Sequence, residues 1–120
     1  MGVQKALMHT KYKGILGEFI ASIYLMLKGF RIEGRRFKTH CGEIDLIASK
    51  DDLVVFVEVK SRKSMEKCFN AIKNRQLCRI QRASQIFLKR YPSLAAHQIR
   101  YDVVFISDWC LPLHLENVCM

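Results

Sequence analysis

Two acidic residues and one lysine are spaced so that a single β-hairpin would gather their side chains. Asp45 lies in the apolar run from Ile44 to Ala48, and Glu58 and Lys60 lie in or just after the run from Leu53 to Val59. Side chains alternate between the two faces of a strand, so Glu58 and Lys60 share a face. A turn with an even number of residues places Asp45 on that same face, opposite or diagonal to Glu58. The spacing therefore predicts two carboxylates and an ammonium group close together.

Such a cluster has two interpretations. The turn is either Asp51 and Asp52 alone or the four residues from Ser49 to Asp52, and either length keeps the three side chains together. Carboxylates among valines are costly to bury unless they bind something. Carboxylate oxygens suit Mg²⁺ or Mn²⁺, which takes one or two of them and leaves its other positions to water and substrate phosphate. The alternative is an exposed hairpin face with a cross-strand salt bridge.

Asp45, followed after a turn by Glu58-Val59-Lys60, resembles the signature of the PD-(D/E)XK nuclease superfamily. More closely, four blocks in order resemble the YraN-like bacterial proteins, which are related to archaeal Holliday-junction resolvases. These blocks are Gly17-Glu18, Gly42-Glu43-Ile44-Asp45-Leu46-Ile47, Val57-Glu58-Val59-Lys60-Ser61-Arg62 and Arg100-Tyr101-Asp102-Val103-Val104. The resemblance covers residues 12–108. It implies a metal-dependent endonuclease, with branched or flapped DNA of repair or recombination as the expected substrate.

The resemblance also implies a role for each residue of the site. Asp45, Glu58 and the Val59 carbonyl would hold Mg²⁺ or Mn²⁺, and Glu18 would be an accessory ligand reaching in from a helix. Lys60 would orient the attacking water or stabilise developing charge. Without the resemblance, Glu18 would be interpreted as a solvated glutamate in the first turn of a helix, favoured by the helix dipole.

A helix is predicted from Gly14 to Lys28, with Gly29 as its stop. Its apolar residues recur every four positions, at Ile15, Phe19, Ile23 and Leu27. Glu18 follows a different line, which it shares with Ala21, Ser22 and Leu25. Because these residues are small or apolar, this line is expected to pack closely against a sheet.

The segment from Phe30 to Lys38 is predicted as a first strand rich in basic residues. Its cations are candidates for holding a phosphate backbone, or for protecting a sheet edge; they include Arg35, Arg36 and Lys38. YraN-like proteins usually have asparagine, an aromatic residue and arginine here, whereas this chain has Arg36-Phe37-Lys38. Strand alternation places Glu43 on the same face as Asp45. Glu43 is therefore either a secondary carboxylate of the metal site or the partner of a cation such as Arg62.

A long helix is predicted from Cys68 to Tyr91, with Pro92 ending it. Its buried stripe comprises Ile72, Ile80, Ala83 and Phe87, and Gln76 falls on the same stripe. Family members mostly have lysine where this chain has Gln76, which the resemblance places in support of the catalytic site. A polar group on an apolar stripe needs a partner, either a site water or the Lys60 amine. Three arginines lie on the opposite side of this helix: Arg75, Arg79 and Arg82. They are either a solvated face or a contact for the DNA backbone.

A last strand is predicted from Gln98 to Ser107, with Arg100 and Asp102 as a structural ion pair. The tail that follows adds a short edge strand near Leu113 to Val118 or stays irregular. The element order predicts an α/β fold with a restriction-endonuclease-like core, αβββαβ. The mixed β-sheet would have three antiparallel strands, a parallel fourth and helices on its faces. The chain is expected to form a single nuclease-like domain, with a core at about 12–108 and tails at 1–11 and 109–120.

Composition agrees with a basic globular protein. The chain has 120 residues, is half apolar and carries a formal net charge of +9, which favours a polyanionic partner, nucleic acid ahead of membrane. Five cysteines without a Cys-x-x-Cys pair indicate reduced thiols and a cytoplasmic location. No apolar run reaches the roughly 18 to 20 residues of a membrane span.

Three functions remain open from the sequence. The first is the endonuclease, acting on DNA or RNA; symmetric cutting of two strands would require a homodimer. The second is a nucleic-acid-binding module that keeps the fold without cutting, since +9 charge suffices for binding and Arg36 and Gln76 depart from the family pattern. The third is an interaction protein of DNA processing whose basic helix docks on an acidic partner.

Overall fold

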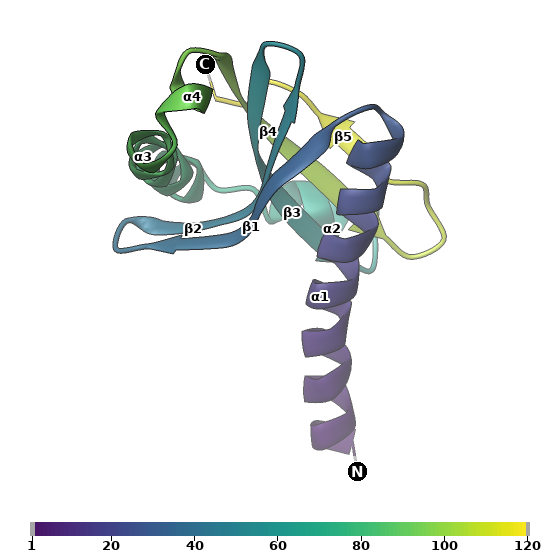
Figure 1. Ribbon diagram of the computed structural model, residues 1–120. Helices are drawn as coiled ribbons and strands as arrows, with labels where there is room; N and C mark the ends of the chain where they lie inside the picture. The colour runs from purple at the N-terminus through teal and green to yellow at the C-terminus, as the bar shows by residue number, and fades with distance from the viewer. Residues whose placement is uncertain (1, 120) are drawn as a thin grey trace.

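The fold is built on a five-stranded sheet with strands in the order β1-β2-β3-β4-β5. The computed structural model describes residues 2–119, with side chains from residue 14 onward. The strands are β1 (Arg31–Thr39), β2 (Gly42–Lys50), β3 (Leu53–Arg62), β4 (Gln98–Ser107) and β5 (Leu113–Leu115). The helices are α1 (Gly2–Leu27), α2 (Met65–Asn70), α3 (Asn74–Arg90) and α4 (Pro92–Ala95). Figure 1 shows α1 extending well past the sheet toward the N-terminus.

The predicted topology is confirmed. β1 pairs antiparallel with β2, β2 pairs antiparallel with β3, and β3 pairs parallel with β4. The short β5, which was one of two options for the tail, pairs antiparallel with β4. α1 and α3 cover opposite faces of the sheet, because each packs on a different set of strand side chains. This α/β arrangement, with the order αβββαβ, is that of a restriction-endonuclease-like core.

The hairpin between β2 and β3 has the shorter of the two turns allowed by the sequence. Lys50 pairs with Leu53, so the turn is Asp51 and Asp52 alone. Asp51 has φ 52, the left-handed conformation that tight two-residue hairpins use. The turn is also tied to the start of β4, since the Gln98 amide donates to the Asp52 carbonyl at 2.7 Å. This register leads Asp45 to the position opposite Glu58.

The face of α1 that packs on the sheet is the small-residue line predicted for it. Ala21, Ser22 and Leu25 are completely buried. Close approach also depends on Gly17, where an added Cβ would lie only 2.9 Å from the Ser61 Cβ. A larger side chain at Gly17 would therefore push α1 away from β3.

The apolar residues that recur every four positions in α1 lie on its solvent side. Ile15, Phe19, Ile23 and Leu27 are 44%, 56%, 38% and 83% exposed. The helical period of these residues therefore predicted the helix but not its buried face. Within residues 2–119, no helix combines the length and the apolar character that crossing a bilayer requires.

Two predicted helix boundaries were wrong. α1 begins at Gly2 rather than at Gly14, so the helix extends through the segment before Gly14. The helix predicted from Cys68 to Tyr91 is instead two helices, α2 and α3, separated by residues 71–73. Cys68 packs against β4 in one cluster, whereas Ile80, Ala83 and Phe87 pack against β2 and β3 in another. The chain changes direction at residues 71–73 and so makes both sets of contacts.

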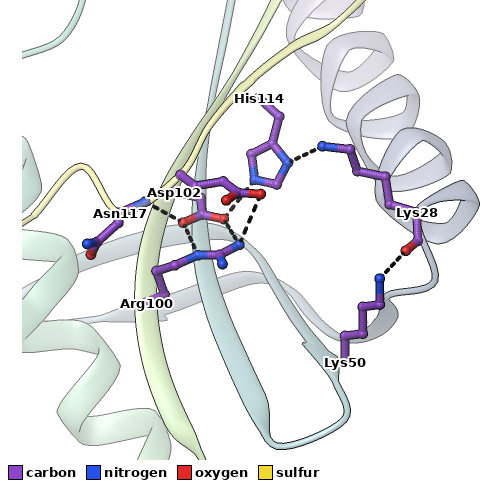
Figure 2. Close-up of polar contacts among 7 residues, drawn as sticks. Lys28, Lys50, Arg100, Asp102, His114 and Asn117 are labelled. Carbon is purple, nitrogen blue, oxygen red and sulfur yellow. Dashed lines mark hydrogen bonds and ion pairs between the residues drawn. The ribbon is translucent and has the colours of Figure 1, made fainter.

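A buried polar network joins β4 to β5, as Figure 2 shows. Asp102 accepts two hydrogen bonds from the Arg100 guanidinium, at 2.9 and 2.8 Å, which confirms the predicted ion pair. It also accepts from the Asn117 amide at 3.0 Å and lies 2.7 Å from His114 Nε2. Burial alone would raise the pKa of Asp102, but the hydrogen bonds from His114, Arg100 and Asn117 outweigh burial and lower it.

The same network holds the C-terminal end of α1. His114 Nδ1 lies 3.0 Å from the Lys28 Nζ, and the Lys50 Nζ donates to the Lys28 carbonyl at 2.8 Å (Figure 2). α1 is thus attached to β5 and to the β2–β3 turn just beyond its last residue. Glu18 lies ten residues before Lys28, about 15 Å along the helix axis. These contacts therefore help to position Glu18.

Candidate active site

The three side chains predicted to cluster meet where β2 separates from β3. The hydrogen-bonded ladder between these strands ends at the pair Leu46–Val57, so the backbones of Asp45 and Glu58 are not paired in the ladder. Its carboxylate turns to the edge of β3 and accepts a hydrogen bond from the Val59 amide at 2.8 Å. The Lys60 Nζ lies 3.1 Å from the Glu58 carboxylate, and both side chains are almost fully buried. This salt bridge lies within β3 in a buried site, so it is not the cross-strand pair on an exposed face that the alternative predicted.

Gln76 of α3 closes a triangle with Glu58 and Lys60. The Lys60 Nζ donates to Gln76 Oε1 at 2.6 Å, and Gln76 Nε2 donates to Glu58 Oε1 at 2.7 Å. One of the two partners predicted for Gln76, the Lys60 amine, is therefore confirmed as a contact. Because the amide uses both its oxygen and its nitrogen, it fixes the two charged side chains relative to each other.

Burial makes this site unfavourable for two negative charges. It raises the pKa of Asp45 to about 8, helped by the neighbouring Glu58 charge and opposed by the Val59 amide. The pKa of Glu58 is also raised, mainly by burial, although the Lys60 charge opposes this shift. A proton or a bound cation must therefore compensate one of the carboxylates near neutral pH.

Glu18 reaches the same site from α1, where it is paired with Arg36. The Arg36 Nε donates to Glu18 Oε2 at 2.8 Å, and this hydrogen bond is the main reason that the pKa of Arg36 is raised. Arg36 has φ 49, in the left-handed region. Consecutive strand residues normally point to opposite faces, but here Arg35 also reaches α1, donating to Ser22 Oγ at 2.6 Å. The left-handed residue therefore turns both arginines toward the helix.

Two cavities open onto the cluster. The larger, about 650 Å³, is lined by Glu18, Asp45, Glu58 and Lys60. Further along its wall lie three cations, Arg62, Lys63 and Lys67. The smaller, about 190 Å³, lies on the α3 side and reaches Glu43, Asp45, Glu58, Gln76 and Arg79. Glu43 and Arg79 thus border the smaller cavity, whereas Arg62 borders the larger one, and the two cavities share Asp45 and Glu58.

The remaining predicted nucleic-acid contacts are spread over the surface. Arg62 and Arg79 line the two cavities, whereas Arg75 and Arg82 are exposed on α3 and line neither. Lys38 is exposed on β1, also outside both cavities.

Sequence reasoning did not assign a site role to Lys63 or Lys67, which lie beside Arg62 on the wall of the larger cavity. The signal that could have found them is the basic composition of residues 61–67, which directly follow Lys60. Ser61 also borders this cavity, and its buried hydroxyl has no hydrogen-bond partner among the described side chains.

The donor set suits a hard divalent cation only in part. Asp45 and Glu58 offer carboxylate oxygens in a partly dehydrated cavity, which is the ligand type and number that Mg²⁺ commonly takes from a protein. Glu18 is close but engaged by Arg36. Across the described part of the chain, no three acidic, histidine or cysteine side chains are arranged to hold one ion. The cavity thus offers two carboxylate ligands, and water and substrate oxygens would have to supply the others.

The chain matches the uncharacterised protein family UPF0102 over residues 17–106. A UPF0102 protein of Mesorhizobium japonicum is 46% identical over 105 residues, covering 88% of this chain and 84% of that protein. One from Rhodopseudomonas palustris is 44% identical over 104 residues, covering 87% and 80%. One from Rhizobium meliloti is 42% identical over 105 residues, covering 88% and 86%. The chain therefore belongs to the UPF0102 family, in agreement with its resemblance to the YraN-like proteins.

Proposed function

We propose that this protein is a metal-dependent endonuclease of the PD-(D/E)XK type that hydrolyses phosphodiester bonds in DNA. One observation carries the proposal: Asp45, Glu58 and Lys60 converge on a cavity whose wall also carries Arg62, Lys63 and Lys67. Carboxylates, an ammonium group and flanking cations are what a nuclease needs to hold a divalent cation against a phosphate backbone.

Asp45, Glu58 and the Val59 carbonyl are the proposed ligands of Mg²⁺ or Mn²⁺. Burial raises the pKa of both carboxyl groups, so binding a cation there would release protons and remove an electrostatic cost. When bound, the ion would activate a water and neutralise charge on the scissile phosphate. Glu18 would join the ligands after leaving Arg36.

The other polar residues of the cluster have positioning or electrostatic roles. Lys60 is held between Glu58 and Gln76, so its ammonium group is fixed where it can orient the attacking water or offset charge that develops on the phosphate. Gln76 holds Glu58 and Lys60 in register. The wall cations would bind the phosphates on either side of the scissile one, because a cation there attracts the backbone without reading sequence.

The experiment is cleavage of single-stranded, duplex, flap and four-way-junction DNA with Mg²⁺ or Mn²⁺. We expect wild type to cut at least one substrate and Asp45→Asn and Lys60→Ala to lose cleavage while keeping their fold and most of their DNA affinity. Asn is nearly isosteric with Asp, so Asp45→Asn removes charge without opening a cavity. Cleavage retained in either purified variant would contradict the assignment.

A nucleic-acid-binding module without catalysis is the second candidate, and the Glu18–Arg36 pair favours it. In this conformation the third carboxylate is neutralised by a side chain, where the family usually has asparagine rather than arginine. This candidate predicts binding that chelation leaves unchanged and no cleavage of any substrate in the panel. Metal-dependent cutting that EDTA abolishes would eliminate it.

A further inference from the structure

The loop between β4 and β5 displays an aromatic side chain in solvent. Trp109 is fully exposed, and Leu111 in the same loop is 86% exposed. Trp109 also has φ 63, in the left-handed region that bulky residues rarely adopt. A tryptophan can bury some 150–250 Å² of surface, and here it forgoes that gain while holding a strained backbone. A binding function would account for both costs.

The parallel pairing of β3 and β4 places this loop beside the candidate active site. Lys60 lies opposite Phe105, and Arg62 lies opposite Ser107. The two strands therefore end at the same edge of the sheet. Trp109 follows Ser107 by two residues, so its Cα lies within about 7 Å of the Ser107 Cα and within about 12 Å of the Arg62 Cα.

A second contact fixes the same edge from the helix side. Ile106 packs near Gly17, where an added Cβ would be 4.0 Å from the Ile106 Cβ. Gly17 precedes Glu18, which lines the larger cavity. The end of β4 is thus held against the part of α1 that borders this cavity, and the loop projects outward from there (Figure 1).

An exposed indole next to cations suits one kind of ligand, an unpaired nucleobase whose phosphates bind nearby. Bases stack on aromatic side chains irrespective of sequence, while the backbone follows a positively charged groove. Bases inside a duplex are already stacked on one another, so they offer the indole no free face. The upper bound of about 12 Å from Arg62 corresponds to at most about three to four stacked bases at about 3.4 Å each.

We propose that Trp109 is a stacking platform for an unpaired base of the strand whose phosphates bind along Arg62 and Lys63. The inference rests on the proposed function and deepens it, because it names the substrate class: nucleic acid with a single-stranded segment next to the scissile phosphate. Flaps, gaps and frayed junctions have such segments, whereas an intact duplex does not.

Trp109 is the chain's one tryptophan, so its fluorescence reports on the proposed contact directly. The titration uses a 15-nucleotide oligothymidylate and a duplex of equal length, in EDTA and low salt so that nothing is cut. Stacking is expected to quench the fluorescence with the single strand and to leave it nearly unchanged with the duplex. Absence of quenching, or of any single-strand binding, would overturn the inference.

Affinity measured by anisotropy of labelled DNA separates stacking from a general effect on the loop. Trp109→Ala should weaken single-strand binding about 5- to 150-fold and leave duplex binding unchanged, and Trp109→Phe should restore most of the loss. Leu111→Ala, an exposed apolar change in the same loop, is the matched control and should have no effect. Equal losses for single strand and duplex would contradict stacking and indicate a general effect of the substitution on the loop.

The binding assay and the cleavage assay test the two proposals separately. Quenching without cleavage in any metal would leave the platform in place and overturn the nuclease. Cleavage without quenching would keep the nuclease and overturn the platform. Because Trp109 is fully exposed, its replacement removes no packing, and loss of folding is not expected to obscure the result.

Discussion

At the scale of single residues, the Asp45 carboxyl is the group whose state depends most on conditions. Burial raises its pKa to about 8 from an ordinary value of 3.8. Between these two pH values, the Asp45 carboxyl therefore keeps its proton in the folded state but has lost it in the unfolded state. Stability from this group is fully present below about pH 4 and is lost as pH rises through about 8.

We expect the free energy of unfolding, measured by urea titration in EDTA, to fall between pH 5.5 and 8.5. The slope should approach about 1.4 kcal/mol per pH unit, the value for one proton. Asp45→Asn should flatten this slope and stabilise the protein at pH 8. Glu43→Gln is the control, because Glu43 borders the smaller cavity but is exposed. An unchanged slope in Asp45→Asn would show that Asp45 is ionised in the folded protein.

Arg36 competes with any cation that would use Glu18. Its guanidinium occupies Glu18 Oε2 at 2.8 Å, so Arg36→Gln should tighten Mn²⁺ binding in calorimetry about two- to fivefold, the range for one exposed ion pair. Arg35→Gln removes the same charge from the next residue but touches Ser22 instead of Glu18, and should change the affinity less. Equal effects of the two variants would mean that only net charge matters.

At the scale of elements, the distance between α1 and β3 depends on one glycine. An added Cβ at Gly17 would meet the Ser61 Cβ at 2.9 Å and its hydroxyl at 3.0 Å, whereas Gly14 has nothing within 4 Å. Gly17→Ala should therefore lower the free energy of unfolding by about 1–3 kcal/mol. Gly14→Ala should be neutral or stabilising by up to about 1 kcal/mol, because alanine is the better helix former.

Urea unfolding of the two variants checks this prediction, and Gly17→Ala with Ser61→Gly should recover part of the loss. If Gly14→Ala and Gly17→Ala behave alike, the close approach of α1 to β3 is not limiting. Because Glu18 follows Gly17 directly, Gly17→Ala should also disturb the position of Glu18 and weaken the cation affinity of the site.

Local patterns were sufficient to predict the hairpin. Alternation over residues 53–59 and an even-numbered turn placed Asp45, Glu58 and Lys60 together, because both depend on sequence neighbours alone. The bounds of β4 were also predicted correctly, from Gln98 to Ser107. The family resemblance added Glu18 to the candidate site, and the structure brings it to the same cavity.

Features set by distant contacts could not be predicted. The break between α2 and α3 exists because the two helices pack on different strands. The left-handed conformation of Arg36 occurs where β1 faces Asp45, between the pairs Arg35–Leu46 and Phe37–Ile44. The limit of about 12 Å between the Trp109 and Arg62 Cα atoms follows from parallel pairing of strands far apart in the sequence.

At the scale of the whole molecule, a net charge of +9 makes binding to a polyanion salt-dependent. The location of the cations should matter more than their number. If nucleic acid lies along the larger cavity, Arg62→Gln with Lys67→Gln should reduce the slope of log affinity against log salt. The expected reduction is about 1.8 for duplex or about 1.4 for single strands.

The control removes the same charge elsewhere. Arg31 and Lys89 are exposed and line neither cavity, so Arg31→Gln with Lys89→Gln should leave the slope nearly unchanged. Anisotropy titrations between 50 and 200 mM salt, in EDTA, measure both slopes. Equal reductions in the two double variants would mean that binding is not confined to the proposed face.

The two-residue turn at Asp51 and Asp52 restricts how this protein's length can vary over evolution. Its register leads Asp45 to Glu58, and a slip by one residue would bring Val57 or Val59 opposite Asp45 instead. A single-residue deletion in this turn would leave too few residues to join Lys50 to Leu53, so it would shift the register and separate the two carboxylates. Relatives that keep the activity should accordingly have β2–β3 turns of at least two residues and should lose residues elsewhere.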